Sequence, residues 1–494
     1  MNRRDFLKAI GVGAASLTIS GCANGVKLSG GKKSAKRPNI LFCISDDQSW
    51  LHAGAYGDKV VKTPNFDRVA KEGVLFTHSF CAASSCTPSR GAILTGQDIW
   101  RLEEGGLLFG TLPAKFQVYT DLLEGAGYHV GFTRKGWSPG RVKPSGRKQN
   151  PAGPRYKSFE QFLEARPEGQ PFCFWFGSSD PHRGYKWQSG LKSGMKLENV
   201  TVPEFLADSE EVRTDICDYY WEIQRFDREV GQLLQILEEK GELDNTLIVV
   251  TSDNGMPFPR AKTNLYDYST RMPLAVRWAA NIKGNRIVDD LISHTDFAPT
   301  FLEAAGVEVP KEMTGRSFLK VLLSGKSGRV DPKRNRVFTA LERHTWCRPN
   351  GVGYPCRTIR THRWLYIRNY EPERWPAGGP DFESSHQSIY GDIDNSPTKT
   401  YMMEHKDDPN VAPLFQLAFG KRPAEELYDV SKDPAQIHNL AADHAFARVK
   451  RKLLGQLEQY QRDTKDPRIE GESPWDHYPY YYRDFWKRAV RPTG

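Results

Sequence analysis

Continuous apolar runs alternate with amphipathic stretches along the first two thirds of the chain. Four runs are apolar enough for strands buried on both faces of a sheet, namely 40–45, 128–133, 172–177 and 246–252. Between them, helical periodicity predicts helices over 64–72, 119–125 and 211–240, and Gly241 stops the last one. This alternation predicts an α/β fold with a mostly parallel sheet sandwiched by helices.

The pattern changes in the last third of the chain. A helix is still expected over 296–305, but 336–341 and 357–368 alternate apolar and polar residues, as antiparallel strands do. We therefore expect a larger domain over 38–330 and a smaller α+β domain over 331–494. Within the smaller domain, 371–400 is rich in Pro, Gly, Asp and Ser and is predicted to be an insertion loop. An aromatic tail over 474–486 is expected to pack as a strap on the main domain.

A possible helix cap and the cysteines are two further local features of the sequence. Thr63 precedes the helix over 64–72 and has a side chain able to cap it. Of the eight cysteines, Cys43 and Cys173 lie inside apolar runs and are expected in the core. Cys347 and Cys356 are able to pair in an oxidising compartment, but their spacing alone does not decide this.

The first residues are predicted to be a targeting signal and not part of the folded domain. Arg3-Arg4-Asp5-Phe6-Leu7-Lys8 resembles a twin-arginine export signal, and Ile19-Ser20-Gly21-Cys22 resembles a bacterial lipobox. We expect 1–21 to be a signal and 22–37 a linker whose Cys22 carries lipid. The protein would then be an exported lipoprotein, in the periplasm or on the cell envelope, held at the membrane by its lipid anchor only. No apolar run is long enough to span a membrane.

The positive charge is concentrated in that leader. Residues 1–37 hold eight cations and one anion, so they account for +7 of the formal net charge of +9 and leave +2 for the rest. A generally basic surface for acidic polymers is therefore not supported. Nucleic-acid binding is not expected either, since the body has no recognition motif and no basic stripe. Any preference for an anion must arise locally.

Cys86-Thr87-Pro88-Ser89-Arg90 carries the strongest chemical signal. A proline two residues after the cysteine fits the first turn of a helix, where its missing N–H costs nothing. Cys86 would then lie at a helix N-terminus, where partial positive charge favours anions. Arg90 lies one turn further on and is able to reach back toward the same point. A nucleophile in this setting suits a negatively charged substrate.

Polar residues follow each of the four predicted strands. Because parallel strands end at one edge of a sheet, these residues are expected to converge there. Asp46, Asp47, Asp253 and Asn254 form an all-oxygen set, which favours Ca²⁺ or Mg²⁺ over zinc. The remaining strand ends supply a cation and a titratable group, in Arg134-Lys135 and in Asp180-Pro181-His182-Arg183.

The stretch from Cys86 to Arg90, followed by Leu94-Thr95-Gly96, resembles the signature of the type I sulfatases. The resemblance implies an alkaline-phosphatase-like fold in which 38–330 is the catalytic domain. It also implies that a sulfatase-maturing enzyme oxidises Cys86 to formylglycine, whose aldehyde hydrate is the nucleophile. Ca²⁺, favoured over Mg²⁺, is then expected on a ligand set made of Asp46, Asp47, residue 86, Asp253 and Asn254.

The resemblance also suggests roles for the other strand-end residues. Arg90, Lys135 and Lys262 would neutralise the sulfate, and His182 would protonate the leaving group. Asp253 would orient or deprotonate the attacking hydroxyl. The second hydroxyl of the hydrate would expel sulfate and regenerate the aldehyde. A serine has no second hydroxyl on the same carbon, so its sulfate ester could not break down in this way.

Within this family the chain looks closest to the heparan N-sulfatase (sulfamidase) group. The supporting stretches are Ser252-Asp253-Asn254-Gly255, Lys262-Thr263-Asn264-Leu265-Tyr266, Tyr354-Pro355 with Arg357 and Arg360, and Glu426-Leu427-Tyr428-Asp429 with Asp433-Pro434. The resemblance implies a sulfated oligosaccharide or polysaccharide as substrate, with N-sulfo or O-sulfo groups. The substrate contacts expected from it are Lys262, Asn264, Glu342, His344 and Arg357. Lys262 stands where sulfamidases have Arg, and Trp137 stands where the family commonly has a His, which leaves His182 as the obvious acid.

Other functions remain open at this point. One is an O-sulfatase for marine or algal polysaccharides, and another is a phosphonate or phosphate monoester hydrolase. A third is a sulfoglycan-binding lipoprotein without catalytic activity, although the intact Cys86 and metal set argue against it. The sequence decides neither the sugar, nor the sulfated position, nor the oligomeric state.

Overall fold

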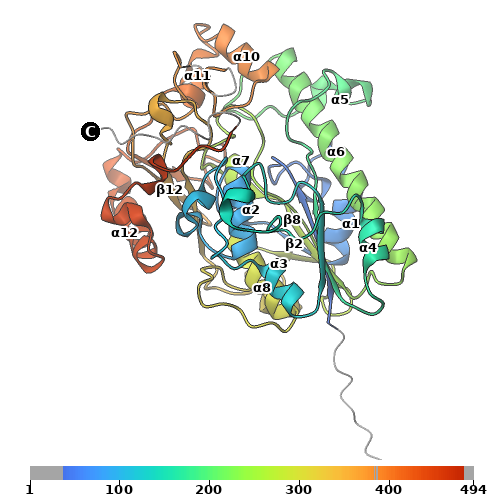
Figure 1. The fold of residues 1–494 in the computed structure, drawn as a ribbon. Helices are drawn as coiled ribbons and strands as arrows, with labels where there is room; N and C mark the ends of the chain where they lie inside the picture. Colours follow the sequence, from blue (N-terminus) through green and yellow to red (C-terminus); the bar gives the residue numbers. More distant parts are fainter. Residues whose placement is uncertain (1–36, 383, 385–387, 483–494) are drawn as a thin grey trace, which may run out of the picture. The chain divides into compact units, whose positions relative to one another are not determined.

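The fold was analysed in a computed structural model that describes residues 37–382, 384 and 388–482 (Figure 1). The export signal expected over 1–21, most of the linker and the last residues of the aromatic tail lie outside the described residues. Among the residues that are described, no helix combines the length and the apolar character needed to cross a membrane.

A seven-stranded sheet forms the centre of the fold. The four predicted strands are neighbours in it and run parallel, in the order β4 (His129–Arg134), β5 (Phe172–Gly177), β1 (Asn39–Ser45) and β6 (Thr246–Ser252). Three shorter strands extend it beyond β6, namely β8 (Leu274–Arg277), β2 (Val74–Phe76) and β9 (Arg286–Val288). Because β8 is antiparallel to both of its neighbours, the sheet is mixed but mostly parallel.

Alternate side chains of β1 bury two separate cores. Ile40, Phe42 and Ile44 pack with α2 (Cys86–Thr95), α3 (Tyr119–Gly125) and α8 (Phe297–Ala304). Leu41 and Cys43 point to the other face and pack with α1 (Pro64–Glu72), α4 (Phe159–Ala165) and α6 (Glu210–Glu239). Figure 1 shows the two groups of helices on opposite faces of the sheet. The side-chain alternation of a strand buried on both faces produces this arrangement.

The predicted capping role of Thr63 is wrong. Its side chain makes no capping hydrogen bond to α1; instead its hydroxyl accepts one from the Gly54 N–H, at 2.8 Å. Asp227, on the neighbouring α6, accepts the N–H groups of Asn65 and Phe66 at 3.1 and 2.8 Å. The cap is therefore supplied by a tertiary contact that local sequence does not reveal.

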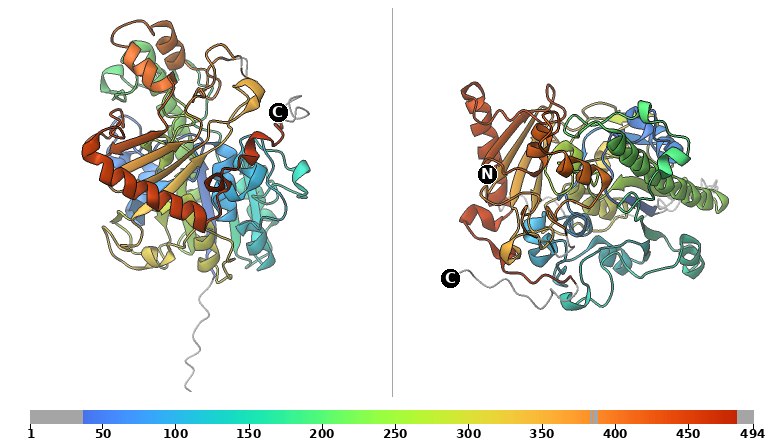
Figure 2. Two further views of the ribbon diagram at one scale, coloured as in Figure 1. Left: turned by 90° about the vertical axis from the view of Figure 1, so that its left-hand side faces the viewer. Right: turned by 90° about the horizontal axis from the view of Figure 1, so that it is seen from above.

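A second sheet of four antiparallel strands follows in the last third. Its order is β11 (Arg336–Leu341), β12 (Cys356–Thr361), β13 (Trp364–Asn369) and β14 (Glu425–Asp429). The predicted run 357–368 is thus a hairpin. α12 (Ala447–Asp463) packs its Leu453 and Leu457 on this sheet, and the left view of Figure 2 shows the helix in front of the strands. The domain boundary near residue 330 stays a prediction, because residues from 37 on group as one compact unit.

The remaining elements are short. A small sheet joins β10 (Ile292–Ser293), β3 (Ser79–Phe80) and β7 (Arg271–Met272). Within the described residues, the other α-helices are α5 (Ser189–Lys192), α7 (Asp267–Thr270), α9 (Leu319–Leu323), α10 (Pro397–Glu404) and α11 (Ala412–Phe419), and short 3-10 turns occur between the elements. Just before α2, the carbonyl of Ala82 accepts the N–H of Ala340 on β11 at 3.0 Å. This bond ties the second sheet to the segment that leads into α2.

Candidate active site

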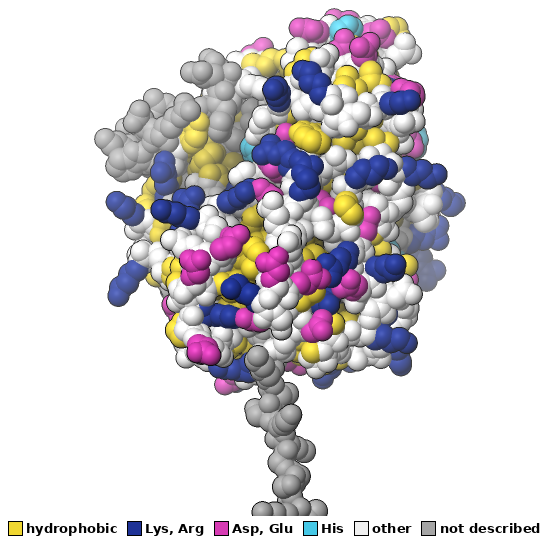
Figure 3. All heavy atoms as spheres, turned by 90° about the vertical axis from the view of Figure 1, so that its right-hand side faces the viewer, with side chains coloured by type: hydrophobic (Ala, Val, Ile, Leu, Met, Phe, Trp, Pro, Cys, Tyr) yellow, Lys and Arg dark blue, Asp and Glu magenta, His cyan; other side chains and the backbone are white. Residues whose placement is uncertain are grey.

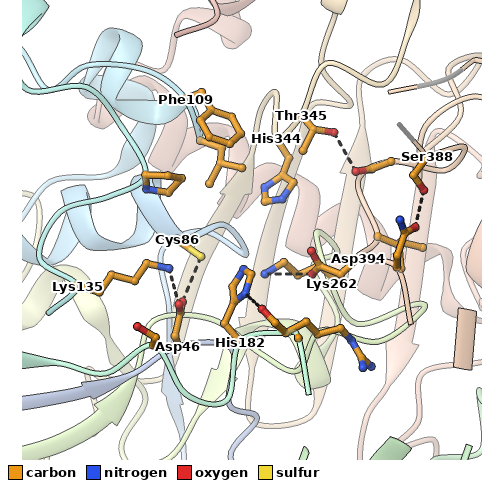
Figure 4. Close-up of a pocket in the computed structure, with 18 of the residues that line it drawn as sticks. Asp46, Cys86, Phe109, Lys135, His182, Lys262, His344, Thr345, Ser388 and Asp394 are labelled. Carbon is orange, nitrogen blue, oxygen red and sulfur yellow. Dashed lines mark hydrogen bonds and ion pairs between the residues drawn. The ribbon is translucent and has the colours of Figure 1, made fainter. Parts of the chain in front are cut away.

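A pocket of about 750 Å³ opens at the carboxyl ends of β1, β4 and β5. Asp46, Cys86, Lys135, His182 and Lys262 all line it (Figure 4). Asp46 and Lys135 come directly after β1 and β4, and His182 lies in the segment that follows β5. The convergence expected from the strand ends is therefore present, at the edge where open α/β sheets bind ligands.

Cys86 is the first residue of α2 and is buried. Its Sγ lies 3.4 Å from Asp46 Oδ1 and 3.9 Å from Asp47 Oδ1. Burial, with the nearby charges of Asp253 and Asp46, raises the pKa of this thiol well above its ordinary value. A thiol held in its neutral form is a poor nucleophile, so an unmodified Cys86 does not suit nucleophilic attack here.

Three carboxylates gather beside Cys86. One ligand atom each from Asp46, Asp47, Cys86 and Asp253 falls within 4.8 Å of the others. Asp253 Oδ1 accepts the N–H of Asp47 at 3.1 Å, and Asp47 has a left-handed φ of 72°. Asn254 Oδ1 is buried and has no hydrogen-bond partner within the described part of the chain. The amide nitrogen of Asn254 donates to Asp47 Oδ1 at 2.5 Å, so the side chain borders the carboxylates. With its amide turned over, Asn254 and the three carboxylates match the donor set of a hard divalent cation.

Three cations neutralise these carboxylates. Lys135 Nζ lies 2.5 Å from Asp46 Oδ2, and Lys262 Nζ lies 2.6 Å from both oxygens of Asp47. The Arg90 guanidinium donates from Nε to Asp253 Oδ2 at 2.8 Å and lies 3.6 Å from Asp46. Burial opposes protonation of Lys135 and Lys262, but the facing carboxylates outweigh it and raise the pKa of both amines. Both lysines therefore remain charged at neutral pH.

His182 faces the same carboxylates with a defined tautomer. Its Nδ1 lies 2.6 Å from the carbonyl oxygen of Arg183, which only accepts hydrogen bonds, so Nδ1 carries a hydrogen. Nε2 lies 3.9 Å from Asp47 Oδ2. In the neutral ring Nε2 has only a lone pair, and it donates a proton only when the ring is an imidazolium.

The opposite wall comes from the second sheet and from the predicted insertion loop. His344 and Thr345 follow β11, and the loop contributes Ser388, Asp394 and Asn395 (Figure 4). The sequence did not single out these three loop residues. A stretch rich in Pro, Gly, Asp and Ser predicts only a loop, and nothing local shows that it folds back over a distant strand end.

Other expected substrate contacts lie away from the pocket. Glu342 and Arg357 pair with each other at 2.8 Å and are both buried, with Asp466 and Arg468 completing an ion-pair network under the second sheet. Asn264 is buried and donates to the carbonyl of Lys262 at 2.7 Å. These three residues support the fold around the pocket instead of lining it, which corrects the prediction that they touch substrate. The sequence resemblance identified their positions but not their orientation.

Trp137 and the two cysteines that were candidates for a disulfide are all buried. Trp137 packs in the core beside α2, and its indole N–H has no hydrogen-bond partner among the described residues, so it offers nothing to the pocket. Cys347 and Cys356 are both buried free thiols and do not pair.

In the described part of the aromatic tail, Tyr481 N–H donates to the Phe109 carbonyl at 2.9 Å, and Tyr482 lines the pocket. The tail therefore does pack as a strap on the main domain.

Comparison with known proteins connects this geometry to a family. The family described as Sulfatase matches residues 38–147 and 154–307, and that described as N-sulphoglucosamine sulphohydrolase, C-terminal, matches residues 260–379. An ulvan-active sulfatase of Formosa agariphila is 29% identical over 441 residues, covering 85% of this chain and 79% of its own. Human N-sulphoglucosamine sulphohydrolase is 28% identical over 482 residues, covering 88% of this chain and 91% of its own.

A solved structure supports the fold. The structure of a protein in complex with its substrate D-glucosamine-2-N,6-O-disulfate superposes with a TM-score of 0.63 at 21% identity, covering 89% of this chain and 100% of the other. The predicted alkaline-phosphatase-like fold is thereby confirmed. Since the Sulfatase match covers more than half of the 494 residues, the chain belongs to the sulfatase family and is a sulfuric ester hydrolase.

Proposed function

We propose that this protein removes sulfate, from N-sulfo or O-sulfo groups of sulfated glycans, through a hydrated aldehyde formed from Cys86. The observation that carries the proposal is the convergence on Cys86 of an acidic metal set, two pocket lysines and His182 at one sheet edge. The sulfated amino sugars named for the human relative and for the substrate-bound structure support a glycan substrate.

The donor set fits a calcium ion. Asp46, Asp47 and Asp253 would supply carboxylate oxygens, and Asn254 would supply its amide oxygen, which has no hydrogen-bond partner among the described residues. Calcium accepts several oxygen ligands in flexible geometry, whereas magnesium demands a stricter octahedron. The ion would hold sulfate oxygens and withdraw charge from them. Lys135 and Lys262 would then turn from the carboxylates toward the bound sulfate.

The remaining chemistry belongs to side chains of this chain. Oxidation of Cys86 by a sulfatase-maturing enzyme, followed by hydration, would supply the attacking hydroxyl that the neutral thiol lacks. Asp253 lies close to residue 86 and would orient that hydroxyl. Arg90 holds Asp253 in place through the 2.8 Å contact. His182, as an imidazolium, would pass the proton from Nε2 to the leaving nitrogen or oxygen.

The cellular location is also proposed. Twin arginines and a lipobox support export and lipid attachment at Cys22, so the enzyme would act on glycan fragments in the periplasm or at the cell envelope. Calcium and oxidised residue 86 would have to be in place on a folded protein before it meets this substrate.

Sulfate release tests the proposal. Protein co-produced with a sulfatase-maturing enzyme would be assayed on N-sulfo and 6-O-sulfo glucosamines, sulfated algal oligosaccharides and 4-nitrophenyl phosphate. We expect sulfate from a sulfated amino sugar, no activity in Cys86→Ala, and loss on calcium chelation. Faster release of phosphate than of sulfate would identify a phosphate monoesterase. Sugar binding without release would identify a binding lipoprotein.

A further inference from the structure

Asp394 places a carboxylate beside the groups that would meet the scissile bond. Its Oδ2 lies 3.8 Å from Lys262 Nζ, and no described residue forms a hydrogen bond with this buried oxygen. One ligand atom each of Asp394, His182 and Asp47 lies within 4.8 Å of the other two. Figure 4 shows Asp394 and His182 on opposite sides of Lys262, all facing into the pocket. Asp394 thus borders the space between the sulfate-neutralising lysine and the proposed acid.

The wall that carries Asp394 is fixed in place. The ammonium of the buried Lys399 donates to Ser388 Oγ and to the carbonyl of Ile393 at 2.9 Å each, and to the carbonyl of Tyr390 at 3.1 Å. Asp392 accepts from Arg348 at 2.8 Å. The backbone on the N-terminal side of Asp394 is therefore anchored, which keeps the carboxylate at the pocket.

A carboxylate at this point distinguishes two kinds of leaving atom. An ester oxygen has only lone pairs, so it accepts a proton from His182 but is repelled by the Asp394 charge. A sulfamate nitrogen carries a hydrogen, which it is able to donate to a carboxylate while its lone pair faces His182. A hydrogen bond to an ionised acceptor is stronger than one between neutral groups, whereas an ester oxygen at the same place would leave two acceptors facing each other.

We infer that Asp394 is a specificity residue that accepts the N–H of an N-sulfo group and so favours N-sulfo over O-sulfo amino sugars. The inference rests on the proposed sulfatase function and names its preferred substrate class. In the reaction water is consumed and the S–N bond breaks. Sulfur leaves as sulfate with one oxygen from water, and nitrogen leaves as an amine that takes up a proton. The resulting ammonium is a cation next to Asp394, so the product side gains the same contact.

The test compares two substrates within each protein. Matured wild type and Asp394→Asn would be assayed with N-sulfoglucosamine and with N-acetylglucosamine 6-O-sulfate. We expect Asp394→Asn to lower kcat/KM for the N-sulfo substrate by about 10- to 100-fold, and to leave the O-sulfo value unchanged or higher. Asp407→Asn, an exposed aspartate after α10, is the matched control and should leave both values unchanged.

A binding measurement supports the test without requiring turnover. Glucosamine should inhibit the wild type as a product, and Asp394→Asn should raise its inhibition constant by about tenfold. Glucose, which has a hydroxyl in place of the nitrogen and so has neither an ammonium group nor an N–H, should inhibit the two proteins equally. An Asp394→Asn protein that is inhibited by glucosamine as strongly as wild type would overturn the inference.

The outcomes separate this inference from the proposed function. An equal fall for both substrates would mean that Asp394 only positions Lys262 and would contradict the inference. Sulfate release by wild type from the O-sulfo substrate alone would also contradict it, while the sulfatase function stands. No sulfate release from any substrate, by protein whose residue 86 is an aldehyde, would instead overturn the proposed function.

Discussion

Single residues around Cys86 show how the pocket balances charge. Each acidic side chain has a cationic partner at close range: Lys135 with Asp46, Lys262 with Asp47, and Arg90 with Asp253. Removing one partner from such a buried pair leaves an uncompensated charge, which is costly. When a divalent cation and an anion bind together, the carboxylates pair with the metal cation and the lysines pair with the anion. No buried charge is then left without a partner. The balance therefore suits joint binding of metal and sulfate.

His182 should matter most for poor leaving groups. In His182→Ala we expect kcat on an N-sulfo or alkyl sulfate to fall by about 10²–10⁴, since the departing amine or alkoxide needs a proton. With 4-nitrophenyl sulfate the fall should be much smaller, because nitrophenolate leaves without one. Steady-state kinetics on both substrates measure the difference. Equal losses would show that His182 binds sulfate or metal instead of acting as the acid.

The residues at the strand ends were predictable, whereas those on the far wall were not. Asp46, Lys135 and Asp253 lie at the ends of apolar runs and His182 lies a few residues past one, so the parallel sheet predicts their meeting. Asp394 reaches the pocket through a loop whose path depends on contacts with α10 and with Thr345, which follows β11. Glu342 was expected at the sugar, but its carboxylate instead pairs with Arg357 and Arg468. Local sequence carries no signal for which way such a side chain turns.

At the scale of elements, apolar runs predicted the strands that are buried on both faces. β5 and β6 match their expected ranges, and α3 does as well. The short strands β2, β8 and β9 were not expected, because three or four residues are too few for a periodic pattern. Their pairing depends on the sheet edge that β6 provides.

Asp227 links α6 to the start of α1, and its contribution should depend on pH. Burial raises its pKa to about 6, although the hydrogen bonds from Phe66 and Asn65 oppose this. Between the unfolded value of about 3.9 and 6, the folded state binds more protons, so the stabilisation is full below that window and is lost as pH rises through it.

Asp227→Ala should therefore cost about 1–2 kcal/mol of unfolding free energy at pH 7 from the lost cap, and about 1 kcal/mol more at pH 5. Urea denaturation at the two pH values gives both numbers. Asp98, whose pKa burial also raises to about 6, is present in both proteins and cancels in the difference. A cost that is equal at both pH values would refute the linkage.

The pocket wall held by Lys399 should loosen when that lysine loses its charge. Burial lowers the pKa of Lys399 to about 8, while Asp394, Cys347 and Asp392 favour its charged form. At pH 7, Lys399→Met should raise KM several-fold with a smaller effect on kcat, because the wall loses its ammonium donor. Above pH 9 the wild-type amine is neutral as well, so the two KM values should converge. A gap in KM that stays constant from pH 7 to 9.5 would contradict this role.

At the scale of the whole molecule, charge does not attract the substrate broadly. Lys and Arg are interspersed with Asp and Glu over the face drawn in Figure 3, in keeping with the small net charge that the sequence leaves outside residues 1–37. Recognition of a sulfated glycan then depends on the pocket itself.

Lipid attachment at Cys22 is the prediction at this scale. Cys22→Ser should move the protein from the membrane fraction to the soluble fraction of a producing bacterium, since no other anchor is expected. Its specific activity, measured after extraction, should match that of the wild type. Fractionation followed by immunodetection makes the measurement. A Cys22→Ser protein that stays with the membrane would mean that something other than lipid holds it.

The account depends on what stands at position 86. Mass spectrometry of the peptide that contains residue 86, from protein co-produced with a sulfatase-maturing enzyme, tests it most directly. We predict that the residue is an aldehyde, with its sulfur lost, in the active protein. An intact thiol at position 86 in protein that still releases sulfate would contradict the account.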